Sequence, residues 1–296
     1  MQSKFSTFKG LGFNTFSKLY LTGIIPVMNY CAAVWGYKTY TKIESVQNRA
    51  IRFYLGVHSY ASNHAINGDI GWESCNVRHQ VEMLRFWNRM CNMGNNRLTK
   101  QVFLWDKIIN KKNWCYEVKT LLDRIGNENY FVNLDVIDLS HARERLFKLC
   151  KETWESQICH VAKLRTYNIY KQVYEIEPYV YKIQHRGKRS LLAQFRTGVL
   201  PLAIETGRYN STPLEYRLCL LCNKNFLEDE KHFLLHCELY TELRSNLIMS
   251  VLQIESLYYF KTENEKLKLL MSGELIKHTA NFIYYAYNKR RSFLYK

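Results

Sequence analysis

Proline and glycine are scarce in this chain, with 4 prolines and 13 glycines among 296 residues. So few chain breaks favour long regular elements over the loop-rich architecture of a β-sandwich. Alternating strand patterns are scarce too, whereas apolar residues recur at helical spacing through much of the chain. We therefore expect a mainly α fold, and a hydrophobic fraction of 47% argues against global disorder.

Acidic residues are also few, with 26 Asp and Glu against 42 Lys and Arg, which gives a net charge of +16. A surplus of this size indicates a polyanionic partner, most often nucleic acid. The alternative is a solvated basic surface that only aids solubility. The charge favours RNA or DNA as the partner, and no feature indicates a small-molecule substrate.

A secretory signal is missing, because the opening residues MQSKFSTFKGLGF lack an apolar core and a cleavage site. The 9 cysteines are therefore expected to be reduced thiols in the nucleus or cytoplasm. One uncharged stretch, residues 19–37, approaches the length of a membrane span. Its Pro26, Asn29 and tyrosines favour a buried core segment, so we expect no membrane partner.

Four helices are expected from apolar periodicity, over residues 41–55, 76–93, 114–125 and from 140 to about 164. Thr41 and Glu44 have the spacing of a capping box at the first of them. Asn76 is the expected start of the second. Glycine, which tolerates the left-handed backbone of a helix end, follows three of them, at Gly56, Gly94 and Gly126.

The segment CLLCNKNFLEDEKHFLLHC contains the pattern C-x2-C-x9-H-x4-C, formed by Cys219, Cys222, His232 and Cys237. Two cysteines on a tight turn and two later ligands are what a tetrahedral zinc ion needs. Four protein ligands leave no position for water, so the pattern predicts a structural zinc site rather than a catalytic one. A redox role for C-x2-C is not favoured, because no βαβ pattern surrounds it.

His236 offers an alternative fourth ligand. In one straight helix, His232 and His236 would share a face and Cys237 would point away. A helix that ends near Leu235 would instead let Cys237 turn back toward the site. The strong binding of zinc by thiolates favours Cys237, and His236 stays open as a neighbour or substitute.

A basic segment follows Pro178, in which arginines and lysines alternate with aromatic residues and glycine. Such a composition suits a groove that binds a nucleic-acid backbone beside aromatic stacking surfaces. A solvated linker is the alternative. The residues expected to contact phosphate are Lys188, Arg189, Arg196 and Arg208, joined by two on the helix over residues 41–55, Arg49 and Arg52.

Two regions resemble LINE-type (jockey-like) non-LTR retrotransposon reverse transcriptases. The first is SKLYLTGIIPVMNYCAAVWG with KIESVQNRAIRFYLGV, similar to the stretch after the palm and the thumb helix of that family. The second is IETGRY with the cysteine–histidine segment, similar to the family's C-terminal zinc knuckle, which ends in H-x4-C. The resemblance thus implies Cys219, Cys222, His232 and Cys237 as zinc ligands.

The resemblance implies a C-terminal part of such a protein in four segments. These are a thumb-like helical segment (1–100), a helical connector (101–185), a basic segment with the knuckle (186–256) and closing helices (257–296). A polymerase palm needs paired aspartates to hold two metal ions. No two aspartates are adjacent in this chain. We therefore expect nucleic-acid binding without catalytic residues or polymerase activity. The alternatives are a zinc-stabilised structural or protein-interaction domain without a nucleic-acid role, and part of an active RNA-directed DNA polymerase.

Overall fold

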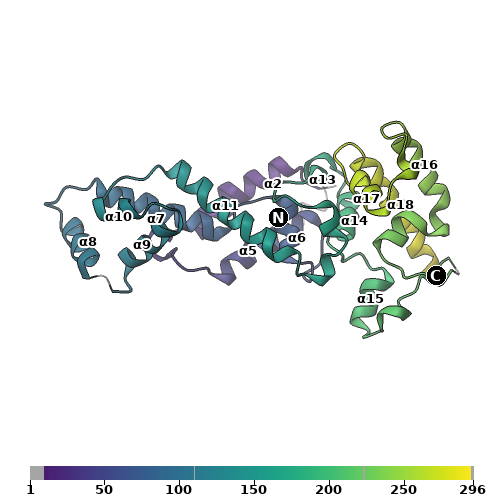
Figure 1. Cartoon of the computed structure of the whole chain (residues 1–296), viewed down its shortest axis with the longest axis horizontal. Helices are drawn as coiled ribbons and strands as arrows, with labels where there is room; N and C mark the ends of the chain where they lie inside the picture. Colours follow the sequence, from purple (N-terminus) through teal and green to yellow (C-terminus); the bar gives the residue numbers. More distant parts are fainter. Residues whose placement is uncertain (1–9, 110, 223, 295–296) are drawn as a thin grey trace. The chain divides into compact units, whose positions relative to one another are not determined.

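The computed structural model describes residues 10–109, 111–222 and 224–294, and over these residues the fold is mainly α, as the sequence predicts (Figure 1). No strand is present in these ranges, although an isolated antiparallel bridge pairs Leu218 with Leu227. The helices in chain order are α2 (Phe13–Leu19), η1 (Tyr20–Ile24), α3 (Ile25–Met28), α4 (Ala32–Trp35), α5 (Thr41–Leu55), α6 (Asn63–Ile70), α7 (Cys75–Cys91), α8 (Leu98–Ile109), α9 (Trp114–Arg124), α10 (Glu128–Asn133), α11 (Leu139–Ile158), η2 (Ala162–Leu164), α12 (Tyr167–Tyr170), α13 (Pro178–Lys182), α14 (Arg186–Arg196), α15 (Ala203–Tyr209), η3 (Leu214–Tyr216), η4 (His232–His236), η5 (Glu238–Tyr240), α16 (Thr241–Leu252), η6 (Tyr258–Phe260), α17 (Glu263–Leu270) and α18 (Ile276–Leu294).

The chain forms two compact units, each assembled from separate stretches. Unit 1 takes its described residues from Met1–Ser17, Asn48–Trp72 and Trp154–Lys296. Unit 2 comprises Lys18–Gln47 and Glu73–Thr153. The four continuous segments expected from the sequence therefore do not coincide with the compact units, because long-range packing joins stretches that are distant in the chain.

Unit 1 has a core in which α14 packs against α18 and α16 against α18. An aromatic group formed by Phe233, Tyr240 and Phe282 lies in this core, with ring centroids 5.0 Å apart for the first pair and 6.4 Å for Tyr240 and Phe282. Three cysteines of the predicted metal site belong to the same core. The packing of unit 1 is thus continuous with that site.

Unit 2 has its own core, built mainly from α7 and α9. Trp87 is fully buried there, stacks on Phe131 at 5.4 Å and donates its indole N–H to the carbonyl of Asp135 at 3.1 Å. The predicted helices of this region are present as α7, α9 and α11. Because the Trp87 ring is buried and its indole N–H has a hydrogen-bond acceptor, it fixes the packing of the surrounding helices.

Helix starts were predicted to within one residue, whereas α7 and α11 end two and about six residues earlier than expected. Gly56 and Gly126 follow α5 and α9 with positive φ angles of 70° and 78°, as expected. The second helix, however, begins at Cys75, and its cap is Ser74, whose hydroxyl accepts from the N–H of Val77 at 3.2 Å. Glu44 does not close a box at its own helix, because its carboxylate accepts from the N–H of Asn76 at 3.1 Å.

Residues 19–37 are not the buried core segment that their composition indicates. The stretch is broken into η1, α3 and α4, and only part of it is buried, at Tyr20, Ala32 and Gly36. Val27 and Tyr30 are 74% and 77% exposed. Over the described ranges, none of the helices combines the length and the apolar character that crossing a bilayer requires.

Candidate metal centre

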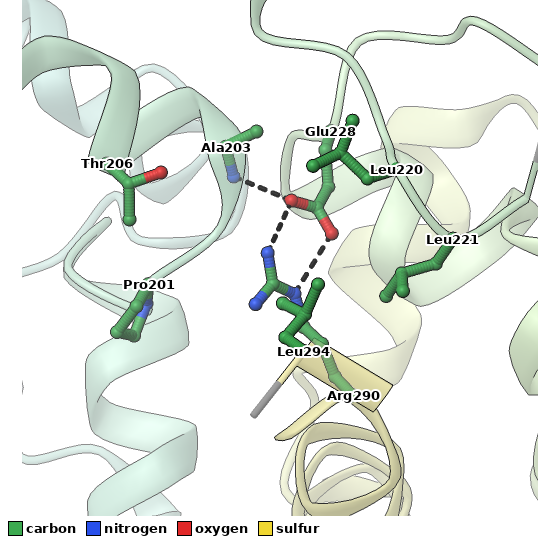
Figure 2. Close-up of a pocket in the computed structure, with 8 residues that line it drawn as sticks. All are labelled: Pro201, Ala203, Thr206, Leu220, Leu221, Glu228, Arg290 and Leu294. Carbon is green, nitrogen blue, oxygen red and sulfur yellow. Dashed lines mark hydrogen bonds and ion pairs between the residues drawn. The ribbon is translucent and has the colours of Figure 1, made fainter. Parts of the chain in front are cut away.

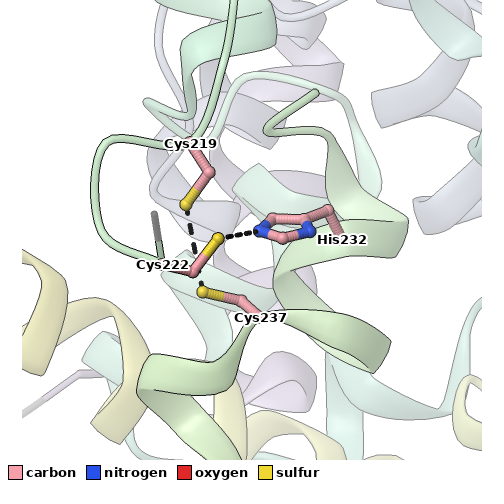
Figure 3. Close-up of side chains that lie close together, drawn as sticks. All are labelled: Cys219, Cys222, His232 and Cys237. Carbon is pink, nitrogen blue, oxygen red and sulfur yellow. Dashed lines mark hydrogen bonds between the residues drawn. The ribbon is translucent and has the colours of Figure 1, made fainter. Parts of the chain in front are cut away.

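A short hairpin places the first two cysteines. The N–H of Cys219 donates to the carbonyl of Phe226 at 2.8 Å, and the N–H of Glu228 donates to the carbonyl of Arg217 at 3.0 Å. These bonds close a turn on which Cys219 and Cys222 both point inward (Figure 3). Two residues between the cysteines are enough to turn both sulfurs toward one point.

The second pair of ligands comes from the one-turn helix η4. Asp229 starts this turn, because its carboxylate accepts from the N–H of His232 at 2.8 Å. The turn ends at His236, and Cys237 leaves it with φ −57° and ψ 123°. This extended backbone directs the Cys237 side chain back to the other three (Figure 3). The early helix end that would free Cys237 is therefore observed.

The four side chains form one buried cluster. Their ligand atoms all lie within 4.8 Å of one another, with the Cys219 and Cys237 sulfurs 3.9 Å apart and the Cys222 sulfur 3.5 Å from Nε2 of His232. All four side chains are buried. Three soft sulfur donors and one imidazole at such distances could hold a metal ion.

Electrostatics within the cluster favours a cation. The hydrogen bond between the two sulfurs raises the pKa of the Cys219 thiol to about 12 and lowers the pKa of the Cys237 thiol. Metal ions bind cysteine as thiolate, so binding releases protons and weakens as the pH falls. A cation also removes the repulsion between thiolates that stand this close together in a buried site.

His236 points away from the cluster. Its Nε2 lies 2.8 Å from a carboxylate oxygen of Glu263, and its side chain is 47% exposed. Of the two alternatives for the fourth ligand, the structure brings Cys237 to the other three and leaves His236 at the surface.

Arg244 holds the polypeptide that carries the second pair. Its guanidinium is buried and donates to the carbonyls of Leu234 at 2.9 Å and Cys237 at 2.8 Å. These carbonyls lie at the end of η4, where a helix leaves acceptors unsatisfied. The sequence pattern does not indicate this role, because Arg244 lies seven residues beyond the last ligand.

Arg244→Met is expected to destabilise unit 1 and to weaken metal binding without removing a ligand. Buried carbonyls left without a donor cost about 1–3 kcal/mol, and loss of an outer support lowers metal affinity about 10- to 100-fold. Competition with a chromogenic chelator measures the affinity. Arg291→Met, an exposed arginine at the end of α18, is the matched control and should leave the affinity unchanged.

The acidic run Glu228-Asp229-Glu230 attaches the metal loop to the rest of unit 1. Glu228 accepts from Nε and Nη2 of Arg290 at 3.0 and 2.7 Å and from the N–H of Ala203 at 2.7 Å (Figure 2). Glu230 accepts from Arg165 at 2.8 Å. Glu228 lines the pocket that Figure 2 shows, and its carboxylate already accepts three hydrogen bonds. We therefore assign Glu228 the structural role of fixing the metal loop.

Two of the arginines expected to contact phosphate are buried, and that prediction is wrong for them. Arg189 is 0% exposed and donates to the carbonyl of Ile183 at 2.9 Å. Arg196 is 1% exposed and forms a two-bond ion pair with Asp69, at 3.0 and 2.9 Å. Both guanidinium groups are buried in unit 1 and donate to groups there, so neither reaches an external phosphate.

The remaining four predicted phosphate contacts lie nearer the surface. Arg49 is exposed on α5, and Arg52 donates to the carbonyl of Ala61 at 2.8 Å. Arg208 is 31% exposed and pairs with Glu205 at 3.4 Å. Lys188 lies over the rings of two tyrosines of α18 and is the best placed of the set.

Similarity to known proteins does not identify the chain. No protein-family model, curated protein or solved structure matches it. The likeness of its two regions to retrotransposon reverse transcriptases therefore stays a prediction. Assignment of a function rests on the chain's own residues, above all on the buried cluster of three cysteines and a histidine.

Proposed function

We propose that this chain is a nucleic-acid-binding module in which one structural zinc ion holds unit 1 together. The observation that carries the zinc assignment is the geometry of the four donors. A tetrahedral zinc ion, with Zn–S near 2.3 Å and Zn–N near 2.0 Å, separates two sulfurs by about 3.8 Å and a sulfur from a nitrogen by about 3.5 Å. One pair of sulfurs here is 3.9 Å apart and one sulfur lies 3.5 Å from the nitrogen, while all four ligand atoms lie within 4.8 Å of one another.

The donor set favours a structural ion over a catalytic one. Four protein ligands complete a tetrahedron, and a catalytic zinc ion keeps one position for water or substrate. Three thiolates and one imidazole are a common set for structural zinc, and oxygen-preferring ions such as Mg²⁺ and Ca²⁺ are excluded by the same chemistry. The ion's role is then to join the hairpin that carries Cys219 and Cys222 to the segment that carries His232 and Cys237.

The nucleic-acid part of the proposal is supported by charge. A net charge of +16 favours association with a polyanion. The chain resembles part of a reverse transcriptase but has no paired aspartates. This resemblance also supports binding of nucleic acid without polymerisation. Zinc-held modules of this kind position basic side chains on a fixed framework, so binding need not involve the metal ion directly.

Binding of the zinc-loaded chain to labelled single-stranded RNA and duplex DNA is expected to weaken steeply as salt is raised. Each phosphate contact contributes about 0.7 to the logarithmic slope for a single strand and about 0.9 for a duplex. Fluorescence anisotropy over a salt series measures this slope. A chain that binds neither probe at low salt would mean that the positive charge serves solubility alone.

A second candidate function is a protein-interaction domain, and one observation in unit 2 favours it. Helix α8 presents an apolar stripe at spacings of four, three and three residues. Its members are Leu98, Val102, Trp105 and Ile108, which are 75%, 48%, 62% and 80% exposed. Large exposed apolar patches often mark protein contacts. A protein partner that protects the α8 amides from hydrogen exchange, in a chain that binds no nucleic acid, would replace the first proposal by this one.

A further inference from the structure

Helices α14 and α18 pack against each other in unit 1, and neither contains an aspartate or glutamate (Figure 1). The acid-free stretches extend beyond the helices, from residue 178 to 204 and from 275 to 294. Of their basic side chains, Arg189 and Arg196 are buried, and Arg290 is paired with Glu228. Within the residues that the structure describes, the two helices therefore carry surface lysines and no acidic residue of their own.

Lys188 of α14 is the centre of a basic and aromatic group. Its Nζ lies 5.6 Å from the ring centroid of Tyr285 and 5.9 Å from that of Tyr284. The two tyrosine rings are 5.4 Å apart at 81°, and the His185 ring lies 5.5 Å from Tyr284. Across the part of the chain that the structure covers, no carboxylate lies within ion-pair distance of Lys188.

The face of α18 next to this group carries an exposed polar stripe. Lys277, Asn281, Tyr285 and Asn288 follow one another at spacings of four, four and three residues, which places them on one side of the helix. All four are exposed, and Tyr285 is 52% exposed. The stripe therefore offers a lysine ammonium, two amides with both donors and acceptors, and an open aromatic ring.

We infer that the Lys188–Tyr285 surface, defined as His185, Lys188, Lys277, Asn281 and Tyr285, binds a single-stranded segment of nucleic acid. The inference rests on the proposed function and gives it a site. An unpaired base stacks on the exposed part of the Tyr285 ring. Lys188 and Lys277 lie beside its flanking phosphates, and Asn281 hydrogen-bonds a base edge.

The aromatic ring decides between a single strand and a duplex. Stacking on an aromatic side chain requires an unpaired base, and it tolerates any base because every base has a π-face. A duplex keeps the faces of its bases stacked inside, so it offers phosphates and base edges but no base face to the Tyr285 ring. An acidic peptide would match the lysines but would leave the tyrosine ring and the amides without a matching group.

The test uses the full zinc-loaded chain with fluorescein-labelled oligothymidylate and a DNA duplex of equal length. Tyr285→Leu is expected to weaken binding of the single strand about 5- to 100-fold and to leave duplex binding nearly unchanged. Tyr285→Phe keeps the ring and should bind as the wild type does. Lys188→Gln should lower the salt slope for oligothymidylate by about 0.7, the contribution of one phosphate contact to a single strand.

Matched controls separate the site from general effects. Tyr259→Leu removes another exposed tyrosine of unit 1, 62% exposed, and Lys148→Gln removes an exposed lysine of α11. Neither should change binding of the single strand by more than about twofold. Unfolding temperature and metal content establish that each variant is folded.

Three results would overturn the inference. In the first, the wild type binds oligothymidylate with a steep salt slope, and Tyr285→Leu and Lys188→Gln bind it equally tightly. This surface is then not the binding site, although the proposed function stands. If polyglutamate displaces the oligonucleotide from the wild type as well as unlabelled oligothymidylate does, the surface accepts any polyanion. If the wild type binds no nucleic acid at low salt, the inference and the proposed function fail together.

Discussion

Removal of the proposed zinc ion is expected to lower the free energy of unfolding of unit 1 by at least about 4 kcal/mol, the stabilisation that a ligand gives at a thousand times its dissociation constant. The apparent binding energy of structural zinc is larger, about 10–16 kcal/mol at neutral pH. Since whole domains are stable by only about 5–15 kcal/mol, unit 1 should lose most of its native packing.

The effect should spread beyond the metal loop because the ligands are part of the core. Cys219, Cys222 and Cys237 belong to the same hydrophobic cluster as Phe233 and Phe282. Without the ion, the hairpin and η4 lose the link that holds them together. Helices α16 and α18, which pack in this region, should then exchange their amide hydrogens faster.

Thermal unfolding and hydrogen exchange with and without a strong chelator measure this effect. Cys219→Ser should reproduce the chelated state even in excess zinc. Cys159→Ser, the same chemical change at an exposed cysteine of unit 1, should behave as the wild type. A chelated chain that unfolds at the same temperature and exchanges at the same rate would show that the cluster does not support the fold.

Arg196→Met is expected to cost unit 1 about 3–5 kcal/mol, the usual loss when one partner of a buried ion pair is removed. Arg196 and Asp69 have side chains that are 0% exposed. Asp69 also accepts from the hydroxyls of Tyr179 at 2.8 Å and Tyr167 at 2.9 Å, and Arg196 pairs with Glu177 at 2.9 Å. Removing the guanidinium leaves the Asp69 carboxylate in the core without its counter-ion.

The pH dependence of stability distinguishes this pair from simple packing. Burial alone would raise the pKa of Asp69, but the Arg196 guanidinium outweighs burial and lowers it. A lowered folded-state pKa stabilises the fold above the unfolded-state pKa of about 3.9. That contribution is lost as the pH falls through the lower folded-state value. In Arg196→Met the carboxylate is buried without a cation, so acidification should stabilise this variant relative to the wild type.

Denaturant unfolding of Arg196→Met, Asp69→Asn and the double variant over a pH series measures both the loss of stability and its pH dependence. The double variant should be less destabilised than the sum of the single ones, because each single change already leaves the other group without its partner. Arg291→Met, at an exposed position of α18, is the control and should lie within about 0.5 kcal/mol of the wild type. Additive losses that do not change with pH would contradict the ion-pair account.

The sequence alone predicts those features that depend on residues close together in the chain. The spacing of apolar residues and a following glycine predict α5 and α9 with their ends. The spacing of Cys219, Cys222, His232 and Cys237 predicts the cluster that the structure shows. Local spacing is sufficient here because a tight turn and one helical turn bring the four side chains together.

Features that depend on distant residues were missed. Arg189 and Arg196 were grouped with Lys188 by local composition, although Asp69, which pairs with Arg196, lies 127 residues away. Helical spacing does not separate these cations, because Lys188 lies four residues before Leu192 and seven before Phe195, and both of these are buried. Only the packing of α14 against distant residues decides which of its cations are enclosed.

The most direct test of the account is zinc K-edge X-ray absorption of the purified chain, together with its metal content. The account predicts one zinc ion per chain with three sulfurs near 2.3 Å and one nitrogen near 2.0 Å. The spectrum should be the same for His236→Gln, whereas Cys237→Ser should be purified with little or no zinc. A chain without zinc, a shell containing oxygen, or two nitrogens that become one in His236→Gln would contradict it.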